Sequence, residues 1–237
     1  MADIECALTD RIKRTPSVES FRFKPQSRLQ FVPGQFLQLL FDKDNPGNKE
    51  LNKYLSFSCG PAAEYIEVTK RLSGSLFSQN LKSLKKNDKV TIKAPMGNTV
   101  FKDEYKKIGF LIGGIGITPV ISIIEYIMDK KLPTDVWLFY TNRTEEEIAF
   151  KKELDGWARS NSNIKILYTV TDCQPKSADC LIGRIEKNLL IEKIEKPADR
   201  IYYVYGPPKM AEAMVDILYK DMGCTKENVK KEMFIGY

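Results

Sequence analysis

The part of this sequence best suited to chemistry is a glycine turn. It lies within residues 110–130, which read FLIGGIGITPVISIIEYIMDK. An apolar run ends in GGIG at residues 113–116, and apolar residues at helical spacing resume after Thr118 and Pro119. Glycines let a backbone approach a phosphate, and a helix N-terminus offers free N–H groups to an anion. Thr118 suits the N-cap and Pro119 the first helical position. Because Pro119 replaces the third glycine of GxGxxG, the turn is either a phosphate site or only a tight turn in a buried segment.

Composition excludes several other kinds of site. The chain contains no histidine, which removes Ser-His-Asp machinery, imidazole zinc sites and histidine-ligated haem. Its five cysteines are odd in number and form no CxxC pair, so we expect reduced, mostly buried thiols and no metal site. Chemistry on this chain is therefore expected to belong to a bound organic cofactor.

The chain length and the charge limit the classes of protein to which this chain can belong. The 237 residues suffice for one large domain or two ordinary ones. The longest apolar stretches, about ten residues, are too short for a bilayer span, and the start MADIECALTDRIKR lacks a signal-peptide core. We therefore expect a cytoplasmic protein. Residues 1–105 hold 17 Lys and Arg against 12 Asp and Glu. That excess could steer an acidic partner or form an ordinary surface, and the dispersed charges do not indicate nucleic-acid binding.

The sequence pattern in the first part of the chain is typical of short β-strands. Segments bounded by Pro, Gly or Asn/Asp turns, with one amphipathic helix near residues 75–84, predict an antiparallel barrel or sandwich. The expected strands lie at residues 7–15, 18–25, 34–42, 54–60, 65–72 and 89–95.

After about Lys106 the pattern changes to apolar strands alternating with helices, which predicts a parallel sheet covered on both faces. The expected strands lie at residues 107–113, 135–141, 164–171, 200–207 and 229–237, and the expected helices at 119–130, 145–160, 185–194 and 208–222. The glycine turn thus follows the first parallel strand, which is the usual pyrophosphate position in such sheets.

Nine motifs, in order, resemble those of the ferredoxin–NADP reductase superfamily and cover nearly the full length. They are FVPGQFLQLLF, KYLSFSCGP, KRLSGSLFSQNL, APMGNTVF, GGIGITP, LFYTNRTEEEIAFKKEL, GRIEKNL, YVYGPPKM and KEMFIGY. The resemblance implies β + α/β architecture: an antiparallel FAD-binding β-barrel domain at residues 1–104, then a Rossmann-like, parallel-sheet NAD(P)-binding domain at residues 105–237.

The resemblance also implies an NAD(P)H-dependent reductase. A hydride would pass from NADPH or NADH to FAD, and electrons would then reach a separate acceptor such as an acidic ferredoxin or flavodoxin. Alternative acceptors are free flavin or a quinone, and a subunit of a larger complex is a second version. The rival class is a non-catalytic nucleotide-binding module.

Flavin contacts are carried over from two of these motifs, KYLSFSCGP and KRLSGSLFSQNL, with Thr69 directly before the second. Ser56 matches the family serine beside the flavin ring and is assigned a catalytic part. Leu55 stands where the family has an aromatic residue, although Tyr54 is adjacent, and Lys53 stands where it has arginine. Residues 74–78 match the flavin-pyrophosphate loop, with Ser73 or Ser75 as a simple N-cap in the alternative interpretation. The implied contacts are Lys53, Tyr54, Leu55, Ser56, Phe57, Ser58, Thr69, Lys70, Gly74, Ser75, Leu76, Phe77 and Ser78.

Nucleotide contacts follow from the later motifs. Arg143 occupies the place after the second parallel strand where an NAD site would carry an acid, so it could instead meet a 2′-phosphate and favour NADPH. Alternatively, Arg143 only balances the three glutamates that follow it. The implied contacts are Gly114, Gly116, Thr118, Pro119, Asn142, Arg143, Tyr205, Gly206, Pro207 and Met210.

The sequence departs from the family near its end. Tyr205 stands where many members have cysteine, and Ile235 where plant-type members have an acid. A plant-type ferredoxin reductase is therefore disfavoured, whereas hydride transfer needs mainly donor–acceptor alignment. The terminal Tyr237 could stack on the flavin and is given a catalytic part, with Phe234 as the alternative.

Overall fold

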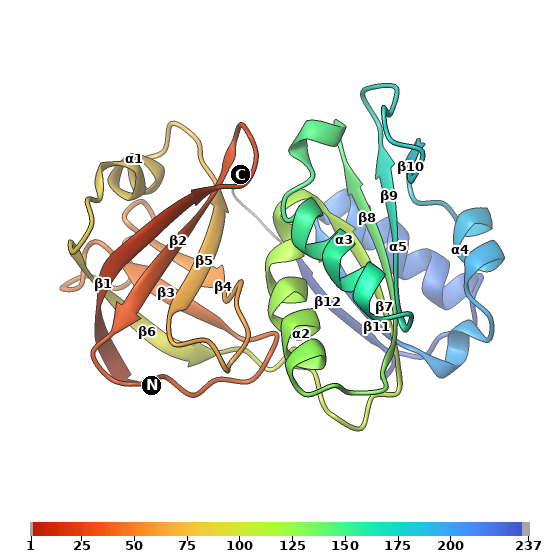
Figure 1. The fold of residues 1–237 in the computed structure, drawn as a ribbon, viewed down its shortest axis with the longest axis horizontal. Coiled ribbons are helices and arrows are strands. Elements are labelled where there is room, and N and C mark those ends of the chain that lie inside the picture. Colours follow the sequence, from red (N-terminus) through yellow and green to blue (C-terminus); the bar gives the residue numbers. More distant parts are fainter. Residues whose placement is uncertain (1, 234–237) are drawn as a thin grey trace. The chain divides into compact units, whose positions relative to one another are not determined.

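A computed structural model describes residues 2–233, which form two compact units (Figure 1). The first unit comprises Met1–Phe101 and Thr118–Lys130, and the second comprises Lys102–Ile117 and Lys131–Tyr237. The expected flavin-stacking residues Phe234 and Tyr237 lie outside the described residues.

The first unit is built on one six-stranded antiparallel sheet with the order β4-β3-β6-β1-β2-β5. All six strands expected in this part of the chain are present. Their bounds are β1 Ala2–Lys13, β2 Val18–Pro25, β3 Phe36–Leu40, β4 Asn52–Ser56, β5 Ile66–Arg71 and β6 Lys89–Met96.

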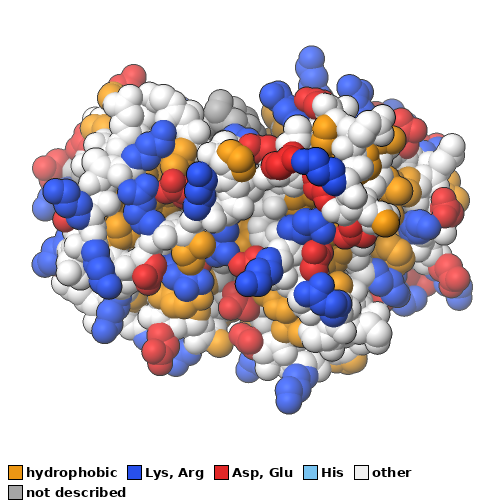
Figure 2. Space-filling view, turned by 45° about the horizontal axis from the view of Figure 1, so that its top comes forward, with side chains coloured by type: hydrophobic (Ala, Val, Ile, Leu, Met, Phe, Trp, Pro, Cys, Tyr) orange, Lys and Arg blue, Asp and Glu red, His pale blue; other side chains and the backbone are white. Residues whose placement is uncertain are grey.

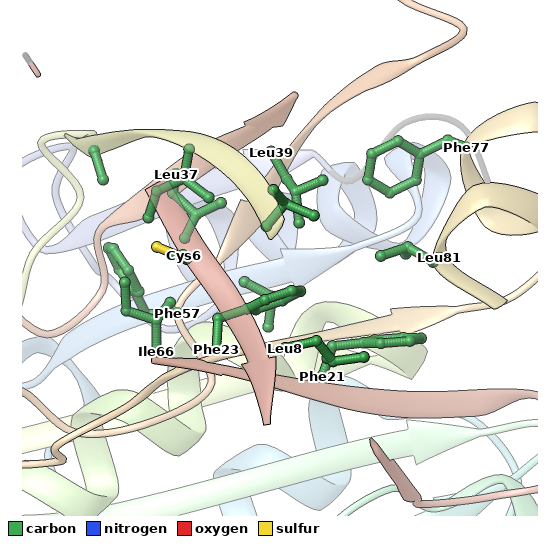
Figure 3. Packing of buried hydrophobic residues seen from close by; sticks show 14 residues of the cluster. Cys6, Leu8, Phe21, Phe23, Leu37, Leu39, Phe57, Ile66, Phe77 and Leu81 are labelled. Atoms are coloured by element: carbon green, nitrogen blue, oxygen red, sulfur yellow. The ribbon is translucent and has the colours of Figure 1, made fainter. Parts of the chain in front are cut away.

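The sheet curls round a core of inward-facing side chains. Alternation along β2 and β3 buries Phe21, Phe23, Leu37 and Leu39, each at 1% exposure or less. Figure 3 shows these side chains pointing toward one another, with Phe77 of helix α1 (Leu76–Ser83) among them. The predicted helix near residues 75–84 therefore contributes to the core of this curled sheet.

The two edge strands, β4 and β5, meet and close the barrel. A single bridge pairs Phe57 with Val68, and the Ser58 N–H donates to the Glu67 carbonyl at 2.8 Å. Just before this point, the Phe57 N–H still donates to Gln35 at 3.2 Å. The chain therefore changes partner strands between Ser56 and Ser58, which forms the seam of the barrel.

The second unit contains a six-stranded parallel sheet with the order β10-β9-β8-β7-β11-β12. The strands are β7 Lys107–Gly113, β8 Asp135–Asn142, β9 Ile164–Val170, β10 Cys180–Ile182, β11 Ile201–Gly206 and β12 Val229–Met233. The helical segments are η1 Gly114–Ile117, η2 Glu145–Glu147, α3 Lys151–Ser160, α4 Lys187–Lys193, η3 Pro197–Asp199 and α5 Pro208–Lys220.

Helices α3 and α5 cover opposite faces of this sheet (Figure 1). Leu111 and Phe139, which are register neighbours, pack in one cluster with Met214 of α5. Tyr168 belongs to the alternate row of side chains and donates its hydroxyl to Asp155 of α3 at 2.7 Å. Both faces are therefore buried, as the continuous apolar strands predict.

Arg200 secures the amino end of this sheet. Its guanidinium, 4% exposed, donates to the carbonyls of Ile108 and Asp135 at 3.0 Å each and pairs with the Asp135 carboxylate. One buried cation thus joins the starts of β7 and β8.

The expected fold class is confirmed, with two local differences in the second unit. The helix predicted over residues 145–160 is divided into η2 and α3, because Phe150 adopts a left-handed conformation with φ 62°. Strand β10 was not predicted, since its three residues are too few to show a period.

Helix α2 (Thr118–Asp129) groups by its contacts with the first unit. Within that unit, its Glu125 accepts a hydrogen bond from the Gly60 N–H at 2.8 Å. Across residues 2–233, each helix is too short or too polar to cross a membrane.

Candidate functional site

Lys70 is a buried cation at the end of β5. It is 9% exposed and follows the core positions Ile66 and Val68 on the same face of the strand. Burial, and then the neighbouring Lys53 ammonium, lower the pKa of Lys70 below its ordinary value of 10.5. Within residues 2–233 the Lys70 ammonium forms no ion pair. Its cross-strand register partner, Glu19, pairs with Arg11 instead. A buried lysine beside a second lysine and outside any ion pair suits an anionic ligand.

Ser56 ends β4, the strand that also carries Lys53. It is 7% exposed, and its hydroxyl makes no hydrogen bond within the described part of the chain. Tyr54 is 64% exposed and lies edge-on to Phe36, at 5.8 Å between ring centroids, whereas Leu55 packs against the barrel core. The expected aromatic face can therefore come from Tyr54 but not from Leu55. Phe57 is wholly buried in the core.

Serine hydroxyls gather where α1 begins. Ser75 is the N-cap, and its Oγ accepts the Ser78 N–H at 3.3 Å and lies 3.1 Å from the Ser78 and Ser73 hydroxyls. The space above Gly74 is open, because an added Cβ would meet nothing within 4 Å. Open backbone, hydroxyls and free N–H groups at a helix N-terminus fit a pyrophosphate. Leu76 is half exposed and Phe77 lies in the core.

Thr69 and Ser58 face away from the lysine pair. Thr69 precedes Lys70 and so points to the opposite face of β5, where its hydroxyl lies 2.7 Å from that of Ser58. Both hydroxyls are buried and belong to an internal polar network. We therefore expect these two hydroxyls not to contact a ligand that binds Lys70 directly.

In the second unit, the turns that follow β7 and β11 pack directly against each other. A Cβ on Gly116 would lie 2.5 Å from the Tyr205 carbonyl, and one on Gly113 would overlap the Met210 sulfur. A Cβ on Gly206 would also approach Met210, at 3.0 Å. Gly113, Gly116 and Gly206 are thus required by close packing. Gly114, with φ 54°, provides the bend.

The start of α2 differs in detail from the sequence expectation. The helix follows η1 without a gap, so Thr118 is its first residue and Pro119 its second. Thr118 is 2% exposed. The helix thus begins one residue before Pro119, which the sequence predicted as its first residue.

Tyr205 lies inside the second unit. Its side chain is fully buried, 6.0 Å from the Tyr203 ring between centroids, and burial raises its hydroxyl pKa far above the ordinary value. Its backbone carbonyl and its Cβ lie against the turn that carries Gly116. Pro207 caps α5 and Met210 lies in its first turn.

Asn142 and Arg143 follow β8 at the carboxyl edge of the parallel sheet. Asn142 is 6% exposed, and both polar atoms of its amide lack a hydrogen-bond partner within residues 2–233. Arg143 is exposed, and its guanidinium makes no contact with a carboxylate in the described chain. A buried amide and an unengaged guanidinium at this edge fit a polar ligand.

Glu145, the nearest acid after Arg143, is committed elsewhere. Its carboxylate accepts the Lys176 N–H at 2.8 Å, the Ser177 N–H at 3.3 Å and the Ser177 hydroxyl. Glu146 pairs with the Lys176 ammonium at 2.9 Å. The glutamates therefore hold the loop that follows β9 and do not neutralise Arg143.

Asp172, which sequence reasoning overlooked, lies beside Arg143. Its N–H donates to the Arg143 carbonyl at 2.8 Å, and its carboxylate accepts the Thr171 hydroxyl at 2.7 Å. The available signal was that Asp172 follows the strand expected at residues 164–171, as Asn142 and Arg143 follow the strand expected at residues 135–141. Carboxyl ends of neighbouring parallel strands meet at one edge.

Among residues 2–233, no group of three or more Cys, Asp or Glu side chains is placed to hold an ion. Burial raises the thiol pKa of Cys180 and of Cys224 to about 11.

Two domain families match the sequence. The profile of the oxidoreductase FAD-binding domain matches residues 5–101, and that of the oxidoreductase NAD-binding domain matches residues 110–216. The first range contains Lys53, Ser56 and Lys70, and the second contains the glycine turn and Arg143.

Curated relatives include NADH-cytochrome b5 reductase 2 of Debaryomyces hansenii, 32% identical over 202 residues, which cover 78% of this chain and 67% of the relative. A nitrate reductase [NAD(P)H] of Betula pendula is 28% identical over 169 residues, 66% of this chain. The chain spans only 19% of that enzyme's length.

Solved structures share the fold at lower identity. The FAD/NAD-binding domain of a Vibrio cholerae nitric oxide dioxygenase superposes with TM-score 0.85 at 19% identity, covering 98% of both chains. A Neisseria gonorrhoeae ferredoxin NADP+ reductase with bound FAD and NADP superposes with TM-score 0.83 at 20% identity, covering 98% of this chain and 99% of that one. The chain therefore belongs to the ferredoxin–NADP reductase superfamily, with an oxidoreductase FAD-binding domain followed by an oxidoreductase NAD-binding domain.

Proposed function

We propose that the protein oxidises NAD(P)H and reduces a separate electron-carrier protein through FAD held on the barrel. Bound FAD supplies the redox chemistry, because it accepts a hydride and releases electrons one or two at a time. We further propose that residues 1–104 act as the flavin domain and residues 105–237 as the nucleotide domain.

The observation that carries this proposal is the uncompensated charge of Lys70. A lysine 9% exposed, with its pKa lowered by burial and by Lys53, is unfavourable without an anion. A pyrophosphate contributed by FAD would offset both ammonium charges. Lys53 acts as a point charge, without the paired donors of the arginine that the family usually has.

The proposed flavin residues act by orientation and hydrogen bonding. The N–H groups at the start of α1, with the Ser75 cap and the open Gly74, would hold phosphate oxygens. The Ser56 hydroxyl, unengaged within residues 2–233, is free to donate a hydrogen bond to the flavin ring. Tyr54 offers an exposed ring for stacking.

Nucleotide preference is proposed to depend on Arg143 and Asp172. The unengaged Arg143 guanidinium would attract the 2′-phosphate of NADPH. The Asp172 carboxylate, close by, would repel that phosphate and accept ribose hydroxyls of NADH. We favour NADPH, because one oxygen of Asp172 already accepts the Thr171 hydroxyl whereas the Arg143 side chain makes no bond to the described residues.

The acceptor is proposed to be an acidic one-electron carrier, such as a ferredoxin or flavodoxin. Residues 1–105 carry the basic excess. Figure 2 shows Lys and Arg side chains over much of the viewed face, with acidic ones among them. Such a surface attracts an acidic partner at long range without a single dominant patch. Named relatives include cytochrome b5 reductases, so a cytochrome b5 is the first alternative to try.

The test is the absorption spectrum of the purified protein after it is supplied with FAD, followed by anaerobic addition of NADPH or NADH. Stoichiometric flavin that bleaches with either nucleotide, and re-oxidises when a carrier protein is added, supports the proposal. Re-oxidation by free flavin or a quinone but by no carrier would move the acceptor to that class. A protein that takes up no FAD would be the non-catalytic module.

A further inference from the structure

Five side chains form a closed polar ring inside the first unit. The Ser58 hydroxyl lies 3.2 Å from the Glu67 carboxylate and 2.7 Å from Thr69, whose hydroxyl lies 2.6 Å from that of Ser20. Arg14 completes the ring, since its Nε donates to Ser20 at 2.7 Å and its Nη2 to Glu67 at 3.1 and 3.2 Å.

The ring is buried and carries charge. Ser20, Ser58, Glu67 and Thr69 are each at most 3% exposed, and the Arg14 side chain is 9% exposed. Arg22 also donates to Glu67, at 2.8 Å, while its guanidinium covers the Tyr65 ring at 4.3 Å. Glu67 is therefore bound by two arginines, and loss of its charge would leave buried Arg14 without that partner.

The ring lies on the seam where β4 and β5 close the barrel. Glu67 holds Ser58 twice, through its carboxylate and through its backbone carbonyl at 2.8 Å. Ser58 follows Ser56 by two residues, and Thr69 directly precedes Lys70. The ring therefore fastens the backbone on both sides of the seam next to Ser56 and Lys70.

The remaining connection across the seam is narrow. Beyond the Ser58–Glu67 contacts, the described residues join the two sides through the Phe57–Val68 bridge and through Cys59, whose sulfur accepts the Glu67 N–H at 3.2 Å. Without the ring, few backbone bonds would hold the end of β4 against β5. A shift there would move Ser56 relative to Lys70.

We propose that Glu67, Arg14 and Ser20 are positioning residues, which set the spacing of Ser56 and Lys70 and thereby the affinity and reduction potential of the flavin. This inference rests on the proposed function, because it assumes that FAD binds at those two residues. None of the three needs to touch the cofactor. They act through Ser58 and Thr69.

The test compares two ring variants with a matched control in the full-length holoprotein. Glu67→Gln removes the charge and keeps the shape, and Ser20→Ala removes one hydroxyl at the far side of the ring. Glu5→Gln is the control, because Glu5 lies on β1 of the same unit but pairs with the exposed Lys89 at 2.7 Å. The measurements are the FAD dissociation constant, the flavin midpoint potential and the thermal unfolding temperature.

We expect Ser20→Ala to raise the FAD dissociation constant about fivefold, the effect of one hydrogen bond. Glu67→Gln should raise it further, and both should shift the midpoint potential, whereas Glu5→Gln should change neither. Ring variants that lower only the unfolding temperature would overturn the inference, since a merely structural ring alters stability alone. If Glu67→Gln fails to fold, Ser20→Ala decides, because it leaves the ion pairs intact.

The wild-type protein separates this inference from the proposed function. Absence of FAD from wild type would reject the proposed function and the inference together. Flavin bound by wild type and equally well, at an equal potential, by the ring variants would reject the inference alone.

Discussion

The Asp172 N–H donates to the Arg143 carbonyl at 2.8 Å, so an aspartate that follows β9 lies beside an arginine that follows β8. Their side chains carry opposite charge but form no ion pair within residues 2–233. Two groups that we propose to discriminate between NADPH and NADH in opposite senses therefore share one edge of the sheet.

Replacing Arg143 tests the 2′-phosphate assignment. We expect Arg143→Ala to raise the KM for NADPH about tenfold or more, the effect of one charge-assisted hydrogen bond, and to change that for NADH little. Steady-state kinetics with both nucleotides measures this. Arg159→Ala, at the end of α3, is the control. An equal effect on both nucleotides would remove Arg143 from this role.

Replacing Asp172 should act in the opposite sense. Asp172→Asn removes a negative charge beside the 2′-phosphate but keeps a hydrogen-bonding group, so kcat/KM for NADPH should rise relative to NADH. Because the residue is exposed, solvent screens the effect, and we expect a change of about threefold to tenfold. Asp216→Asn is the control, because Asp216 is an exposed residue of α5. No change in the ratio would show that Asp172 does not face the nucleotide.

The lowered pKa of Lys70 leads us to expect that FAD affinity depends on pH. Burial, and then Lys53, lower its pKa, so the folded apoprotein releases this proton below the pH at which the unfolded chain does. The unfolded state thus binds more protons in that window, and this group's contribution to apoprotein stability increases as pH rises through it. FAD favours the protonated form, so FAD affinity should fall across the same alkaline window.

The variant Lys70→Met should weaken FAD binding at neutral pH about tenfold, as loss of a charge-assisted hydrogen bond does, and should lose this alkaline pH dependence. Titrations at neutral and alkaline pH measure both effects. Lys85→Met, an exposed lysine of the same unit, should match wild type. An alkaline decline that persists in Lys70→Met would assign the effect to another group.

Alanine substitutions at Gly116 and Gly156 should change the free energy of unfolding in opposite directions. Gly116→Ala would place a Cβ 2.5 Å from the Tyr205 carbonyl, and overpacking of this kind costs about 1–3 kcal/mol. Gly156→Ala in α3 meets nothing within 4 Å and should stabilise by about 0.5–1 kcal/mol. Denaturant unfolding gives both free energies. Stabilisation by both substitutions would show that the turn can open at no cost.

The salt dependence of turnover tests whether the electron acceptor is an acidic protein. Turnover with an acidic carrier protein should fall steeply as salt increases, because screening shortens to about 8 Å at physiological ionic strength. Turnover with ferricyanide is expected to show no comparable fall, and it controls for effects on NADPH binding. A flat response with the carrier would favour a small acceptor.

Much of the fold was predictable because the patterns that specify it are local. Period-two strands up to residue 96 and apolar strands alternating with helices after residue 106 both follow from side-chain spacing. The errors came where spacing carries no information. Phe150 divides a helical pattern by one left-handed residue, and the three residues of β10 are paired by the sheet rather than by their own sequence.

The sequence by itself determined which segments carry candidate groups: the serine loop before α1, the glycine turn, and the arginine after β8. Only the tertiary structure decided which groups meet. Lys70 neighbours Lys53 because two edge strands close a barrel, and Asp172 neighbours Arg143 because β8 and β9 run parallel in register. Such contacts join residues distant in the chain, and packing rather than local spacing specifies them.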